Sequence, residues 1–230
     1  MILTPHFVFL HLHKSGGTFA NEFLIRFVAG AKQVGYHLPR SLIPVPYAQL
    51  PILGFVRSPW SYYVSWYSFQ RSRPQPNALF QTLSQNGSLD FARTIERMLN
   101  LADDGQLLDE VLNSLPNQYT GRGLNLPAFA LAPIRDSGLG FFSYLFQYLF
   151  GTDTRGARIE RMEQLRETLP SMLDSVGVSL SPEALAYLQN APRANTSEHS
   201  AVPSYYDARL NDLVRRKDAL VIDRFGYSNA

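Results

Sequence analysis

The sequence predicts an α/β fold, a three-layer sandwich in which a central parallel sheet of four or five strands carries helices on both faces. Three observations predict it. Short apolar runs alternate with longer segments whose apolar residues recur at helical spacing. The first apolar run breaks into a glycine-containing loop, a usual link from a buried parallel strand to a helix. Helical patterns also outnumber strand patterns, which favours a small sheet covered by helices.

The N-terminal part of the chain contains a strand and a helix joined by a short loop. The apolar run Phe7–Leu10 predicts a buried strand near 6–12. The helix expected near 18–29 has its apolar residues on one face, and Gly30 suits its end. A second strand is expected near 33–37.

A third strand, expected near 52–57, leads into a helix expected near 59–71. Ser58 suits the N-cap of this helix, and Pro59 suits its first turn because an N–H at that position has no partner inside the helix. The expected buried face consists of Trp60, Tyr63, Val64 and Tyr67, and a stripe of serines consists of Ser58, Ser61, Ser65, Ser68 and Ser72.

The C-terminal part is expected to be mainly helical. Ser181, Pro182 and Glu183 form a helix start signal with a cap, a first-turn proline and a first-turn acid. With 230 residues, of which 45% are hydrophobic, the chain can bury one core, so 1–230 is expected to be a single domain. The remaining expected elements are a strand near 157–162 and helices near 88–101, 105–114, 139–150, 163–176, 182–190 and 204–217.

The loop after the first strand, Lys14–Thr18, contains a lysine, two glycines and two hydroxyl side chains. A strand that ends in such a P-loop-like turn and re-enters a helix aims several backbone N–H groups at one point. The helix dipole adds positive charge there, and Lys14 adds a mobile cation. We therefore expect the loop to bind the 5′-phosphate-type group of a nucleotide.

The order of residues in this loop argues against ATP or GTP. A loop for nucleoside triphosphates has its lysine after the glycines, followed by a hydroxyl that binds Mg²⁺. Here Lys14 precedes the glycines, and the strand at 52–57 ends in Arg57 where an NTPase has an aspartate. An anion site without a metal is therefore expected. His11 and His13 are a possible metal pair, but no third ligand is evident.

Arg57 stands at the carboxyl end of a strand, where α/β proteins bind their ligands. Ser65 lies two helical turns past Ser58 on the same side of the helix, so it can share an anion with Arg57. The alternative is that the serines are small residues that allow close packing.

These motifs resemble the sulfotransferase family, whose members use 3′-phosphoadenosine 5′-phosphosulfate (PAPS) and release PAP. The likeness is greatest to the carbohydrate-type branch. It is carried by Lys-Ser-Gly-Gly-Thr at 14–18, by Val-Arg-Ser-Pro-Trp at 56–60 with Ser65, and by Ile-Glu-Arg-Met-Glu-Gln-Leu at 159–165. A tail from Asn195 to Tyr227 is also similar. The resemblance covers about 6–227 and is weakest over 75–155, a mainly helical insert expected on the acceptor side.

The resemblance implies roles for these residues. Lys14 is expected to stabilise the oxygen that bridges sulfur and the 5′ phosphate, while Arg57 and Ser65 hold the 3′ phosphate. Two departures from the family pattern are His13, where many relatives have proline, and Glu198-His199, where a basic residue is common. The expected cofactor-binding residues are Lys14, Ser15, Gly16, Gly17, Thr18, Phe19, Arg57, Ser65, Asn195 and Ser197.

The resemblance also implies a general base that takes the proton of an acceptor hydroxyl, which in this branch is expected on a saccharide or glycolipid. His37 stands at the corresponding strand end, and its intrinsic pKa suits the role. A structural histidine is the alternative. His13 is the second catalytic candidate and is expected to line the acceptor side, with His11 packed under the loop. Gln118 and Tyr119 are weaker acceptor-binding candidates.

Two other function classes are compatible with these residues. A P-loop kinase or NTPase and a non-catalytic nucleotide-binding protein are the two alternatives. The net charge of +2 is too small for a nucleic-acid partner. The chain has no cysteine, which excludes a disulfide framework and thiol chemistry. The most apolar stretch, 138–151, is shorter than the ~20 residues of a membrane span, and no signal peptide is evident. A cytoplasmic bacterial enzyme, or the excised catalytic domain of an anchored enzyme, is expected.

Overall fold

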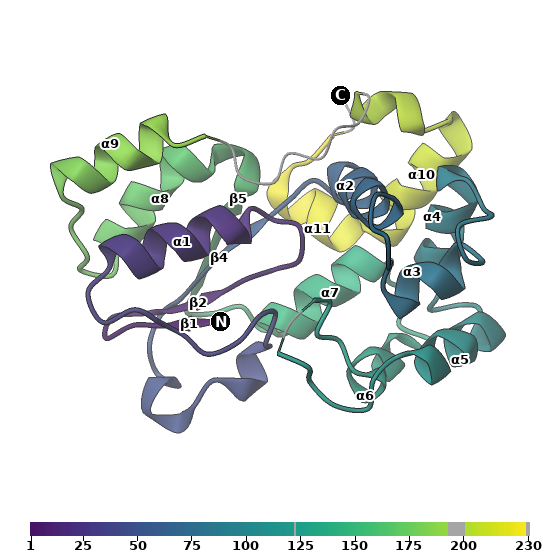
Figure 1. The fold of residues 1–230 in the computed structure, drawn as a ribbon, viewed down its shortest axis with the longest axis horizontal. Helices are drawn as coiled ribbons and strands as arrows, with labels where there is room; N and C mark the ends of the chain where they lie inside the picture. The colour runs from purple at the N-terminus through teal and green to yellow at the C-terminus, as the bar shows by residue number, and fades with distance from the viewer. Residues whose placement is uncertain (122, 193–200, 229–230) are drawn as a thin grey trace. The chain divides into compact units, whose positions relative to one another are not determined.

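The computed structural model describes residues 1–121, 123–192 and 201–228. The chain divides into two compact units (Figure 1). The first unit comprises Met1–Arg57 and Tyr148–Thr196, and the second comprises Ser58–Gln147 and Ser197–Ala230. The single domain expected from the sequence stays a prediction.

The first unit contains a five-stranded sheet with the order β3-β1-β2-β4-β5. Strands β2, β4 and β5 are parallel, whereas β1 is antiparallel to both β2 and β3. The sheet is therefore mixed: the parallel arrangement predicted from the sequence holds for β2, β4 and β5, and the antiparallel pairs of β1 correct it at this edge. The strands are β1 (Ile2–Leu3), β2 (Val8–Leu10), β3 (Lys32–Gln33), β4 (Ile52–Val56) and β5 (Ala157–Arg161).

A tight turn explains the antiparallel edge. Only four residues separate β1 from β2, and a connection this short can only reverse the chain direction. The buried hydroxyl of Thr4 closes the turn, since its Oγ1 donates to the carbonyl of Phe7 at 2.8 Å and accepts from the Phe7 N–H at 2.8 Å. The two-residue strand β1 has no periodicity that the sequence could reveal.

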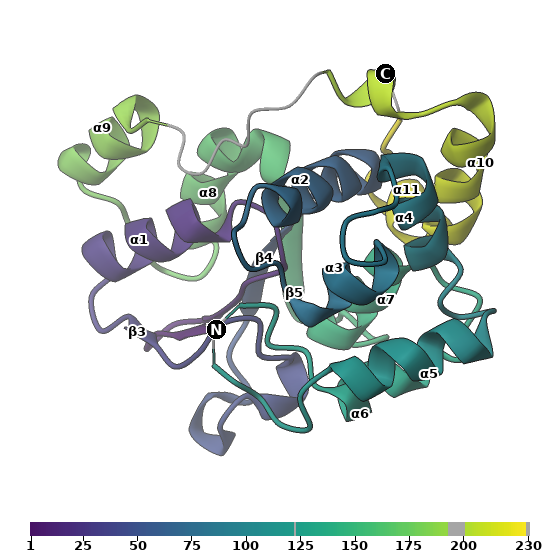
Figure 2. The same ribbon diagram turned by 45° about the vertical axis from the view of Figure 1, so that its right-hand side comes forward.

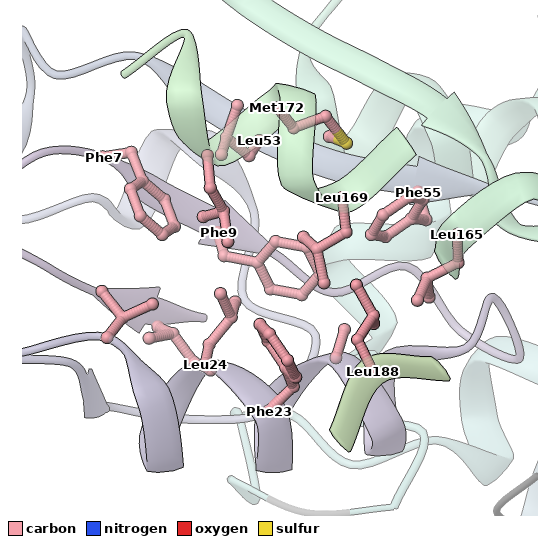
Figure 3. Close-up of a cluster of buried hydrophobic side chains, with 14 of the residues drawn as sticks. Phe7, Phe9, Phe23, Leu24, Leu53, Phe55, Leu165, Leu169, Met172 and Leu188 are labelled. Carbon is pink, nitrogen blue, oxygen red and sulfur yellow. The ribbon is translucent and has the colours of Figure 1, made fainter. Parts of the chain in front are cut away.

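Helices cover both faces of this sheet. On one face, α1 (Gly17–Phe27), α8 (Leu165–Asp174) and α9 (Pro182–Asn190) bury apolar side chains against the strands. Figure 3 shows Phe9 and Phe55 of the sheet among side chains of these three helices. On the other face, Phe150 at the end of α7 (Phe141–Phe150) packs against Gly54, where a Cβ atom would collide with the phenylalanine ring. The predicted helices on both faces are thus confirmed.

The second unit has no strand among its described residues. Helix α2 is buried on most sides, including the four aromatic and aliphatic positions expected from its sequence. Helices α2, α5 and α9 occupy the ranges expected from the sequence, whereas α3, α6 and α11 were not expected. The helices of this unit, besides the first part of α7, are α2 (Pro59–Arg71), α3 (Ala78–Leu83), α4 (Phe91–Leu99), α5 (Gly105–Ser114), α6 (Ala128–Leu131), α10 (Ala208–Lys217) and α11 (Ala219–Phe225).

Short 3₁₀ helices link several of these elements. Among them, η1 (Arg40–Leu42) and η2 (Val45–Tyr47) lie between β3 and β4, and η4 (Met162–Gln164) joins β5 to α8. Two more, η3 (Ala132–Ile134) and η5 (Val202–Tyr205), belong to the second unit. Among the described residues, no helix combines the length and apolar character that crossing a bilayer requires.

A buried carboxylate organises the start of α7 in the second unit. Asp218 is fully buried and accepts hydrogen bonds from the Tyr63 hydroxyl at 2.7 Å and the Ser143 N–H at 2.8 Å. The Tyr63 oxygen in turn accepts from the Phe142 N–H at 3.2 Å. These bonds satisfy N–H groups that the first turn of a helix leaves without partners. Burial raises the pKa of Asp218 from 3.8 to about 6.

This raised pKa predicts how stability depends on pH. The native protein binds the Asp218 proton more tightly than the unfolded chain, so its contribution is complete below about pH 3.8 and is lost as pH rises through about 6. Asp218→Asn removes this titration. The free energy of unfolding, measured by urea titration, should then change less between those pH values than in the wild type. Equal pH dependence in both proteins would contradict this assignment.

Candidate functional site

The loop between β2 and α1 turns through unusual backbone conformations. Lys14 has φ +56° and Gly16 has φ +72°, so the chain enters the left-handed region twice before α1 starts at Gly17. For a residue with a side chain this conformation costs about 1–2 kcal/mol. Helix α1 begins without a side-chain cap at Gly16. Its first N–H groups lack helical partners, and the positive end of the helix dipole adds to them. This geometry suits a bound anion.

The two glycines of the loop are required by crowding. A Cβ atom on Gly17 would overlap the imidazole ring of His11, and one on Gly16 would lie 2.8 Å from the Cγ atom of Met162. His11 therefore packs directly beneath the loop, where its sequence position predicts it. Its ring is held in turn near the amide of Asn21, with 3.4 Å between His11 Nδ1 and Asn21 Nδ2.

Gly17→Ala tests this packing. The added methyl group must displace the His11 ring, so the nucleotide binding that the sequence predicts for the loop should be lost. The double variant Gly17→Ala/His11→Ala removes the obstructing ring and should bind better than Gly17→Ala alone, because contacting residues give non-additive effects. Calorimetric titration with PAP measures the wild type and both variants. If the double variant binds no better than Gly17→Ala, His11 is not the obstacle.

Arg57 follows β4 and reaches back to the loop. Its Nη1 donates to the carbonyl oxygen of Lys14 at 3.1 Å. The pKa of Lys14 falls from 10.5 to about 8, first because the amine is largely buried and second because the Arg57 charge is close. Two neighbouring, partly buried cations repel each other, and a bound anion would relieve that repulsion. The loop and the end of β4 thus form a basic site within the first unit.

Three histidines form a buried cluster beside this basic site. The rings of His13 and His37 are stacked, with centroids 3.6 Å apart and planes inclined by 19°. The rings of His11 and His37 are 4.5 Å apart. His37 has φ +52°, and its Nδ1 lies 2.8 Å from the carbonyl oxygen of His11. A carbonyl can only accept, so Nδ1 carries the proton and Nε2 keeps its lone pair.

The histidine cluster favours neutral imidazoles. Burial lowers the pKa of His37 well below the usual 6.5, and the charges of His13 and His11 lower it further. Burial and the charge of His13 lower the pKa of His11 to about 3. His37 is therefore neutral at physiological pH. A neutral imidazole whose Nδ1–H is already bonded can accept a proton at Nε2.

The other expected residues of the loop have different surroundings. Ser15 is buried, and its hydroxyl donates to the carbonyl oxygen of His13 at 3.2 Å, whereas Thr18 is exposed. Phe19 is half-buried and stacks parallel to Tyr187, with centroids 6.2 Å apart. The guanidinium of Arg166 lies 5.2 Å from the Phe19 ring centroid.

The structure does not place every predicted site residue beside this cluster. Ser65 is buried on α2, Gln118 is exposed, and Tyr119 packs edge-on against Phe129 with centroids 5.6 Å apart. All three belong to the second unit, so their roles stay predictions. Asn195 and Ser197 lie outside the described residues.

Sequence reasoning did not identify two contributors to the site. One is the carbonyl of His11, which fixes the His37 tautomer. The other is Asn21, a buried amide on the apolar face of α1. A polar residue among apolar helix positions is the signal that could have revealed it. Within the described part of the chain, no group of three or more His, Cys, Asp or Glu residues is arranged to hold a metal ion.

Comparison with known proteins shows the fold. No family model matches the chain, and no curated protein matches its sequence. Among solved structures, the mouse sulfotransferase SULT7A1 complexed with PAP is similar, with a TM-score of 0.51 and 12% identity over 92% of this chain and 83% of the mouse chain. The predicted α/β sandwich is thereby confirmed as a sulfotransferase-like fold with a mixed five-stranded sheet. Membership of the carbohydrate-type branch stays a prediction.

Proposed function

We propose that the protein transfers the sulfuryl group of PAPS to a hydroxyl of an acceptor and releases PAP. The observation that carries the proposal is the contact of Arg57 with the Lys14 loop at the ends of two parallel strands. This contact places the side-chain charges of Lys14 and Arg57 close to the start of α1, which has no side-chain cap. The similarity in fold to a sulfotransferase solved with PAP supports the same assignment.

The basic site would bind the two phosphate-bearing ends of the nucleotide. PAPS, when bound, supplies a sulfuryl group joined to its 5′ phosphate. Lys14, with the backbone N–H groups of Gly16 and Gly17, would stabilise the negative charge that grows on the bridging oxygen as the sulfur–oxygen bond breaks. Arg57, assisted by Ser65, would bind the 3′ phosphate through a planar, two-point contact.

The histidine cluster would receive the proton of the acceptor. As the acceptor oxygen forms its bond to sulfur, the hydroxyl proton passes to Nε2 of His37. This nitrogen keeps its lone pair because Nδ1 of the same ring carries the proton that is donated to the His11 carbonyl. His13, stacked on His37, would line the acceptor side. We assign the acceptor to saccharides or glycolipids on the resemblance to the carbohydrate-type branch, with Gln118 and Tyr119 as candidates for contacting it.

Arg57→Ala tests the assignment of the 3′ phosphate. The variant should raise the Kd for PAP by about 10², because a charge-assisted contact is lost. Its Kd for AMP, which has no 3′ phosphate, should change much less. Calorimetric titration with both nucleotides measures the difference. An equal loss for PAP and AMP would mean that Arg57 acts only by holding the loop through the Lys14 carbonyl.

The reaction itself is tested by transfer of labelled sulfate from PAPS to a panel of sugars, glycolipids and tyrosine peptides. Transfer to at least one of them, with PAP binding more tightly than AMP, is the expected result. Tight binding of Mg²⁺-ATP with turnover would instead favour a kinase or NTPase. PAP binding without transfer to any acceptor would favour a non-catalytic nucleotide-binding protein.

A further inference from the structure

Tyr36 lies between the histidine cluster and the solvent. The residue is 40% exposed, whereas His37, which follows it, is 8% exposed, and His11 and His13 are each 6% exposed. The centroid of the Tyr36 ring lies 6.2 Å from that of His11 and 6.2 Å from that of His37. An aromatic surface that solvent can reach is therefore continuous with the cluster that the proposed function assigns to the acceptor.

The turn after β3 gives Tyr36 this position. Strand β3 lies at the edge of the sheet opposite β5 (Figure 2), and the chain leaves the sheet after Gln33. In an extended strand, neighbouring side chains point to opposite faces. The left-handed backbone of His37, with φ +52°, interrupts the extended chain, and the rings of Tyr36 and His37 lie beside each other with planes inclined by 48°. The Tyr36 and His11 rings meet edge to face, with planes inclined by 60°, so the tyrosine ring has two contacts with the cluster.

The chemistry of this surface suits an uncharged ring that carries hydroxyl groups. The face of an aromatic ring has partial negative charge, which attracts the C–H groups on the apolar face of a sugar ring. The imidazoles of His11 and His37 are neutral at physiological pH, because burial lowers the pKa of each. These two rings and Tyr36 therefore offer aromatic area and hydrogen-bonding groups but no charge that would select an ionic acceptor.

We propose that Tyr36 binds the acceptor by stacking against the ring of a saccharide, and thereby holds one of its hydroxyl groups at His37. The 6.2 Å between the ring centroids of Tyr36 and His37 is comparable to the width of one sugar ring with its hydroxyl groups. A sugar stacked on the tyrosine thus reaches the imidazole without a linker. The inference rests on the proposed function and narrows it, because the acceptor becomes a pyranose with an exposed C–H face.

Binding of an acceptor to the full chain in the presence of PAP tests the proposal apart from turnover. The probes are methyl β-galactopyranoside and galactitol, which carry similar hydroxyl groups with and without a ring. Saturation-transfer NMR titrations measure both Kd values, and the wild type should bind the galactopyranoside more tightly. Tyr36→Ala should raise the Kd of the galactopyranoside by about tenfold, because the aromatic contact is lost. The Kd of galactitol should stay unchanged.

Two further variants serve as controls. Tyr36→Phe keeps the ring and should bind the galactopyranoside nearly as well as the wild type does. Leu185→Ala, on α9 of the same unit, truncates a hydrophobic side chain that is 38% exposed, close to the 40% of Tyr36. It should change neither Kd. PAP titration of each variant shows that the fold is intact, since Tyr36 is not among the proposed nucleotide contacts.

Several outcomes would overturn the proposal. They are no binding of the galactopyranoside by the wild type, an equal change for the galactopyranoside and galactitol in Tyr36→Ala, and an equal loss in Tyr36→Phe and Tyr36→Ala. A lower kcat in Tyr36→Ala with both Kd values unchanged would mean that Tyr36 only supports the His37 ring. Weaker binding of 4-nitrophenol in Tyr36→Ala, with the galactopyranoside unaffected, would assign the surface to an aromatic acceptor.

The two proposals fail in distinguishable ways. Galactopyranoside binding that depends on Tyr36, in a protein that transfers no sulfate from PAPS, would overturn the proposed function and support the saccharide site. Transfer to the galactopyranoside with a KM that Tyr36→Ala leaves unchanged would overturn the role of Tyr36 alone. If both hold, Tyr36→Ala should raise this KM with little change in kcat, because the stacking contact is made in the ground state and the transition state alike.

Discussion

Replacing His37 with alanine is expected to lower sulfuryl transfer by about 10²- to 10⁴-fold, the range that general-base catalysis contributes. The affinity for PAP should stay nearly unchanged, because none of the proposed nucleotide contacts involves the imidazole. The physical reason is the Nδ1 bond to the His11 carbonyl, which leaves Nε2 as the proton acceptor. Initial rates with labelled PAPS and calorimetric titration with PAP measure the two quantities.

The stacked histidine provides the control for this prediction. His13→Phe keeps an aromatic ring against His37 but has no proton acceptor. If transfer survives in His37→Ala and is lost in His13→Phe, the role of base passes to His13. The pH profile gives a second readout. Because the pKa of His37 lies well below 6.5, kcat/KM should not fall with a midpoint near that value as the pH is lowered.

Lys14→Met is expected to lower transfer by about 10²- to 10³-fold, as the loss of one preorganised transition-state contact does. PAP binding should weaken by a smaller factor, because the lysine acts mainly on charge that develops during the reaction. Methionine keeps a chain that fills the same space. Lys14→Arg, which keeps the charge, is the matched control and should retain more activity. An equal turnover in Lys14→Met would exclude Lys14 from the transition state.

The lowered pKa of Lys14 gives this prediction a pH signature. In the free protein the amine loses its proton as the pH rises through about 8. A bound anion favours the charged amine and raises its pKa, so PAP affinity should be constant below that pH and decline above it. The decline should be absent in Lys14→Met. In the absence of ligand, the same substitution should raise the melting temperature, because it removes a partly buried cation beside Arg57.

Much of the fold could be predicted because its signals are local. Strand β4 is a continuous apolar run, and α2 and α9 each begin at a proline that follows a serine at the N-cap position. Strands β1 and β3 could not be predicted in their actual pairing. Each has two residues, too few for a periodicity, and the direction of β1 is set by the four-residue turn to β2 that Thr4 closes.

The candidate site could be predicted in its composition but not in its geometry. The order of residues in the loop indicates an anion site. This signal can be recognised in the sequence because it involves only residues that are adjacent along the chain. The His37 contact with His11 joins residues 26 positions apart and depends on a left-handed backbone at His37. No residue pattern in the sequence predicts that conformation. The same holds for the crowding of Gly17 by His11, which only the packed structure reveals.

His11 contacts both the loop and His37. Its ring supports the turn that would grip the donor, and its main-chain oxygen orients the imidazole that would serve the acceptor. A movement of the loop at Gly17 can therefore reach the His37 ring through His11, and the reverse also holds. We therefore expect nucleotide binding at the loop to affect the orientation of the His37 imidazole.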